Sequence, residues 1–92
     1  SMHQFRLALD VVAYVEGTYT YEVDYYIAIA EAVRLEAIRL KVRVLWGGCW
    51  DMALTDMTDV KASMKRYHRK IISLCKVPFV HACQFHHDRS TA

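Results

Sequence analysis

An amphipathic segment between residues 57 and 74 leaves this chain few choices of architecture. Its apolar residues recur every three or four positions, namely Met57, Val60, Met64, Tyr67, Ile71 and Leu74. The opposite face carries the cations Lys61, Lys65, Arg66, Arg69 and Lys70. This spacing predicts an α-helix with one buried face. We expect Asp56 or Thr58 to cap its start and Pro78 to break the helical stretch.

A second helix and three strands complete the predicted elements. The apolar spacing from Tyr26 to Lys41 predicts a helix, with Asp24 as its N-cap. Short runs rich in β-branched or aromatic residues predict strands at residues 7–15, 42–46 and 79–87, and residues 18–22 are expected to form a hairpin arm. The order strand, helix, strand, helix, strand favours an α+β domain, with two helices packed on a small antiparallel sheet.

Length and composition narrow the class of protein. A chain of 92 residues that is 54% hydrophobic predicts one folded domain spanning residues 1–92. The net charge of +2 creates no strong attraction to nucleic acid or to an anionic membrane. Because there is no apolar run of membrane-spanning length and no basic segment followed by an apolar one near residue 1, we expect neither a membrane span nor a signal peptide. The three cysteines are an odd number and are widely spaced, so they indicate no disulfide framework. We therefore expect free thiols and a reducing compartment, the cytoplasm.

Three stretches, in order along the chain, carry a family resemblance. Residues 1–10 are similar to a Ser-x-His-x-x-Gly-x-Ala-x-Asp motif, and residues 44–50 resemble a turn with the pattern Trp-Gly-Gly-x-Trp. Residues 78–85 lie where the family's phage members carry Pro-Phe-Val-Asp-Gly-Pro-His-Phe. The chain thus resembles the phage endolysin-type D-Ala-D-Ala carboxypeptidases and L-alanyl-D-glutamate endopeptidases, which are zinc peptidoglycan peptidases. The resemblance implies their hedgehog/D-Ala-D-Ala-peptidase-like fold, in a shortened form.

The resemblance also implies a site, in a degenerate form. It puts His3, Asp10 and Gln84 at the positions of the three zinc ligands, and His81 at the position of the general base. Catalytic zinc keeps three protein ligands and one water, but Gln84 offers only a neutral amide oxygen. Arg6 replaces the glycine of the first motif. These departures predict that the family's reaction has been lost.

Other arrangements of the same residues stay open. His86 would share a strand face with Gln84 and could supply the missing imidazole. Cys83 and His86 could instead form a structural zinc site together with His81, His87 and Cys49. The simpler interpretation is a polar tail with a buried free cysteine, and no cofactor.

Two surfaces are candidates for binding. The basic face of the residue 57–74 helix could hold phosphate or an acidic protein, although such faces are commonly solvated. An aromatic group could form a second surface, although core packing in so small a domain is expected to use most of it. Its members are Tyr19, Tyr21, Tyr25, Tyr26, Trp46 and Trp50.

The leading hypothesis is a non-catalytic, peptidase-derived small phage protein. It would act in the cytoplasm of an infected bacterium by binding a bacterial protein, with inhibition of that protein as one form of this role, or would pair with a second copy through an exposed sheet edge. The alternative is a zinc peptidase acting on peptidoglycan peptides, with His3 and Asp10 as ligands. A nucleic-acid binder that uses the basic helix ranks last.

Overall fold

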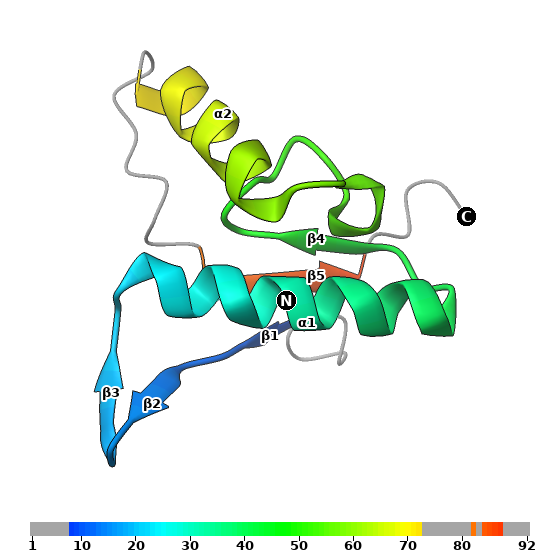
Figure 1. Cartoon of the computed structure of the whole chain (residues 1–92). Helices are drawn as coiled ribbons and strands as arrows, with labels where there is room; N and C mark the ends of the chain where they lie inside the picture. Colours follow the sequence, from blue (N-terminus) through cyan, green and yellow to red (C-terminus); the bar gives the residue numbers. More distant parts are fainter. Residues whose placement is uncertain (1–7, 73–81, 83, 88–92) are drawn as a thin grey trace.

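In the part of the chain that the structure describes, the elements are two helices, a three-stranded antiparallel sheet and a separate β-hairpin (Figure 1). This computed structural model describes residues 8–72, 82 and 84–87. The elements are β1 (Ala8–Asp10), β2 (Ala13–Val15), β3 (Thr18–Thr20), α1 (Val23–Leu40), β4 (Val44–Trp46), a 3-10 turn η1 (Leu54–Asp56), α2 (Val60–Ile72) and β5 (Gln84–His87). The predicted α+β class is confirmed, and both helices lie between strands as expected, although three short strands precede α1. Neither helix in the described part of the chain is both long and apolar enough to cross a membrane.

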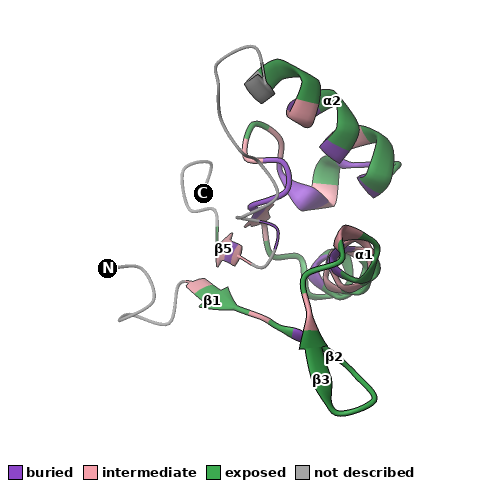
Figure 2. Ribbon diagram, turned by 90° about the vertical axis from the view of Figure 1, so that its left-hand side faces the viewer, coloured by how far each residue is buried: buried purple, intermediate pink, exposed green. Residues whose placement is uncertain are grey.

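The sheet has the strand order β1-β5-β4, so β5, the last of the described strands in the sequence, lies at its centre. Phe85 on β5 lies between Leu9 on β1 and Trp46 on β4. Helix α1 crosses one face of this sheet, and α2 packs against α1 at one end of the molecule (Figures 1 and 2). The predicted layers are therefore correct for α1, whereas α2 packs mainly on the other helix.

The predicted strand over residues 7–15 is divided in two. Residues 8–10 pair with β5, and residues 13–15 pair with β3 in the hairpin. Val11 and Val12 join the two strands outside any sheet. The prediction of one strand was wrong because β-branched residues favour extended backbone but do not specify the partner strand.

Both helices begin at residues other than those predicted. Helix α1 follows Glu22, and Asp24 lies within its first turn, where a carboxylate still interacts favourably with the helix dipole. The N-terminal cap of α2 is Asp59, whose carboxylate accepts a hydrogen bond from the Ala62 backbone at 3.0 Å. Asp56 instead belongs to η1 and forms an ion pair with Arg43.

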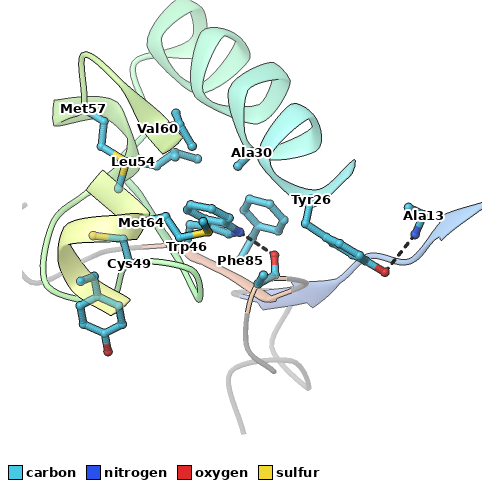
Figure 3. Close-up of a cluster of buried hydrophobic side chains, with 12 residues drawn as sticks. Ala13, Tyr26, Ala30, Trp46, Cys49, Leu54, Met57, Val60, Met64 and Phe85 are labelled. Carbon is cyan, nitrogen blue, oxygen red and sulfur yellow. Dashed lines mark hydrogen bonds between the residues drawn. The ribbon is translucent and has the colours of Figure 1, made fainter. Parts of the chain in front are cut away.

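The core is centred on Trp46, which is completely buried. Its indole N–H donates to the Ala82 carbonyl at 2.5 Å, which connects β4 to the residues before β5 (Figure 3). Phe85 of β5 and Ala30 of α1 lie beside Trp46. The segment between β4 and α2 completes the core with Leu54 and Met57, and α2 adds Val60 and Met64. A single hydrophobic cluster thus joins both helices to the sheet.

Candidate functional site

The sheet brings together two of the positions that the resemblance assigns to metal ligands. Asp10 on β1 lies directly opposite Gln84 on β5. His86 is two residues further along β5, opposite Ala8, and therefore shares a sheet face with Gln84. Its ring makes an edge contact with Trp50, with the ring centroids 4.9 Å apart.

The other predicted ligands do not join this group within the described residues. His3, His81 and Cys83 lie outside them. Among residues 8–72, 82 and 84–87, no three His, Cys, Asp or Glu side chains are close enough together to hold a metal ion.

Cys49 is buried in the core rather than placed at a ligand site. Its thiol donates to Asp51 Oδ1 at 3.3 Å. Burial, reinforced by the hydrogen bond to Asp51, raises the pKa of this thiol to about 12. Because the thiolate is the form that binds metals and attacks electrophiles, this raised pKa disfavours both roles for Cys49 near neutral pH.

Asp51 holds a polar network that the sequence patterns did not indicate. Arg66 of α2 donates two hydrogen bonds to its carboxylate, at 2.7 and 3.0 Å, and Lys70 donates a third at 3.1 Å. The Arg66 guanidinium, followed by Lys70 and the Cys49 thiol, holds the pKa of Asp51 well below its usual range. The network fastens the loop after β4 to α2.

This network divides the predicted basic face of α2 into two parts. Arg66 and Lys70 are paired with Asp51. Lys61, Lys65 and Arg69 instead line a groove of about 430 Å³ between α2 and the start of α1. We call this the basic groove, and its lining is Val23, Asp24, Ile27, Lys61, Met64, Lys65, His68 and Arg69.

The hairpin projects from the body of the molecule and carries three exposed tyrosines (Figures 1 and 2). We call residues 13–22 the tyrosine arm. Tyr14 and Tyr19 lie opposite each other across the hairpin, and Tyr21 follows Tyr19 on the same face. Their rings form two edge-to-face contacts, with centroids 6.0 and 5.6 Å apart. The three side chains are 67%, 54% and 72% exposed, respectively.

The arm is held at both ends. At its tip, Glu16 and Gly17 have φ angles of 52° and 81°, the signs that a two-residue type I′ hairpin turn requires. At its root, the hydroxyl of Tyr26 accepts a hydrogen bond from the Ala13 backbone N–H at 3.3 Å (Figure 3). The same hydroxyl donates to the Thr20 carbonyl at 2.7 Å. The Tyr26 side chain of α1 thus connects both strands of the hairpin by hydrogen bonds, a contact that we call the Tyr26 clasp. This contact fixes the position of the arm and of its tyrosines.

The predicted aromatic group is divided between core and surface. Trp46 and Tyr26 are buried and Trp50 is half-buried. Tyr19, Tyr21 and Tyr25 are exposed, so the expectation that packing would use most of the group was wrong. Tyr14 was missed, although its alternation with the Thr-Tyr-Thr run across the turn was a signal that could have identified it.

Comparison of the chain with models of protein families, with curated proteins and with solved structures gives no match. What the chain does must therefore be inferred from its own residues.

Proposed function

We propose that this chain is a non-catalytic module that binds another protein through the tyrosine arm. The observation that carries the proposal is the set of three exposed tyrosines on one face of a clasped hairpin. Tyrosine gives a large contact area at a small entropic cost, because few torsions are fixed on binding. Exposed apolar groups at this density are typical of interaction sites.

The residues at the resembled ligand positions support a role without catalysis. Asp10 is opposite an amide, Gln84, where the peptidase family has an imidazole. We therefore propose that the hedgehog/D-Ala-D-Ala-peptidase-like fold is kept as a scaffold, and that the partner is a protein of the bacterial host.

Capture of proteins from a bacterial lysate tests the proposal. The wild-type chain should retain a specific bacterial protein, and the variant with Tyr14→Ser, Tyr19→Ser and Tyr21→Ser should lose it. Leu35→Ser is the matched control, because Leu35 is 56% exposed but lies on α1, away from the arm. Equal capture by the triple variant and the wild type would contradict the proposal.

A zinc peptidase is the second candidate, and one observation favours it. The register that sets Asp10 opposite Gln84, with His86 on the same face, brings a carboxylate and an imidazole into one region of the sheet. Stoichiometric zinc that is lost with His3→Ala or Asp10→Ala, together with chelator-sensitive cleavage of peptidoglycan peptides, would favour this candidate over the first.

Nucleic-acid binding by α2 has less support, because Asp51 already pairs with Arg66 and Lys70. Such binding would be strongest at low salt. A lack of binding to DNA and RNA under that condition would exclude it.

A further inference from the structure

Charge is strongly segregated along this chain. From Ala8 to Val33 there are five acidic residues and no lysine or arginine. In α2 there are five lysines and arginines and no acidic residue. The tyrosine arm lies in the acidic part. The cations of the basic groove come from α2, whereas Val23, Asp24 and Ile27 of its lining come from the acidic part.

The arm combines exposed aromatic rings with unneutralised acids. Glu16 at the turn and Glu22 at the root are both exposed, and neither forms an ion pair within the described residues. No cation lies on the arm to balance them. The surface that binds the tyrosine arm should therefore be apolar and bordered by positive charge.

The basic groove has this character. Val23, Ile27 and Met64 provide its apolar part. Lys61, Lys65 and Arg69 follow one another at four-residue intervals, so they form one stripe along α2. The same cations can lie over tyrosine rings, which attract positive charge through their faces.

The positions of arm and groove allow a reciprocal contact. The lining of the groove includes Val23, the first residue of α1, three residues after the end of β3. Because the hairpin leads directly into this end of α1 (Figure 1), arm and groove belong to the same end of the molecule. In a twofold pair, any contact that one copy makes is repeated by the other. Two copies that meet at this end can each offer an arm to the other's groove.

We propose that the tyrosine arm of one copy binds in the basic groove of a second copy, and that two copies exchange arms around a twofold axis. This inference rests on the proposed use of the arm as a protein-binding element and names a second copy as a partner. The contact would join Glu16 and Glu22 to Lys61 and Lys65, with the tyrosines against Val23, Ile27 and Met64.

Sedimentation of the purified full chain over a range of concentrations tests this pairing. The wild type should dimerise, and more weakly as salt is raised. Glu16→Lys with Glu22→Lys should weaken the dimer by about tenfold or more, and so should Lys61→Glu with Lys65→Glu. The combination of all four changes restores opposite charges and should recover most of the affinity.

Glu36→Lys with Asp56→Lys is the matched control. It changes the net charge as much as the arm variant does, and it alters exposed acids on α1 and η1. It should leave the dimer unchanged.

A wild type that stays monomeric at every concentration, or a fourfold variant that does not recover affinity, would overturn the inference. Loss of a captured bacterial protein in the triple tyrosine variant would still support the proposed function, because that experiment does not depend on the dimer.

Discussion

The turn that follows β4 and the tyrosine arm both combine aromatic residues with a glycine, yet the fold uses them in opposite ways. In the core turn, residues 46–51, Trp46 is completely buried. In the arm, Tyr21 is 72% exposed. The core turn is fixed by contacts to α2 and to Ala82, whereas the arm is fixed by its own turn and by the Tyr26 clasp.

The glycines differ in the same way. A Cβ at Gly48 would collide with the ring of Trp46, so this glycine allows close packing. Gly17 has open space around it and is needed for its φ of 81°. The comparison indicates that the core turn serves stability and that the arm leaves its side chains available for a partner.

Truncation of the core turn should have the largest effect. Trp46→Ala removes the centre of the hydrophobic cluster and the hydrogen bond to Ala82, and should cost about 3–5 kcal/mol of unfolding free energy. Urea denaturation followed by circular dichroism measures this loss. A cost below about 1 kcal/mol, the range for a surface residue, would mean that the indole is not the centre of the core.

Removal of the carboxylate at Asp51 should have the second-largest effect on the free energy of unfolding. Asp51→Asn weakens three charge-assisted hydrogen bonds, partly screened by solvent, and should cost about 1–2 kcal/mol at neutral pH. The control is Asp56→Asn, because Asp56 has one exposed partner, Arg43, and its loss should cost less.

The same variant should change how stability depends on pH. Because folding lowers the pKa of Asp51, its stabilisation is complete above the unfolded-state value of about 3.9 and is lost as pH falls through the folded-state value. The wild type should therefore lose more stability than Asp51→Asn below about pH 4. Parallel curves for the two proteins would exclude an energetic role for the network.

A change at the tip of the arm should have a smaller effect. Gly17→Ala forces a Cβ into the left-handed region and should cost about 1 kcal/mol. Gly17→Asn is the control, since asparagine tolerates this conformation and should restore much of the loss. Thermal unfolding compares the two, and an equal loss from both would point away from the φ requirement.

The smallest effect on stability is expected from the exposed face of the arm. Tyr19→Ser removes two edge contacts between exposed rings and should cost about 0.5 kcal/mol. Urea denaturation should barely separate this variant from the wild type. A cost as large as that of Trp46→Ala would show that the arm is needed for folding.

Local patterns in the sequence were sufficient for the elements but not for their partners. Helical spacing located both helices, and the β-branched runs located the strands. The division of residues 7–15 between two sheets depends on pairing with β3 and β5, which no local pattern encodes. Asp59 displaced the predicted caps of α2, since Asp, Ser and Thr are similar as caps and only the helix register selects among them.

The same limit applies to the candidate sites. Asp51 meets Arg66 across 15 residues, so its role has no periodic signature. The tyrosines could be identified as an aromatic group, but which of them would be exposed depended on the clasp by Tyr26. The register sets Asp10 opposite Gln84, whereas His3 and His81 lie outside the described residues, so the ligand set that the resemblance implies stays a prediction.

The most direct test of the arm's role is quantitative capture from bacterial lysate by equal amounts of folded wild-type chain and folded Tyr14→Ser, Tyr19→Ser, Tyr21→Ser variant. We expect a bacterial protein that is retained by the wild type and by Leu35→Ser, and that is absent from the variant. Retention of that protein by all three would contradict the assignment of the arm as the binding surface.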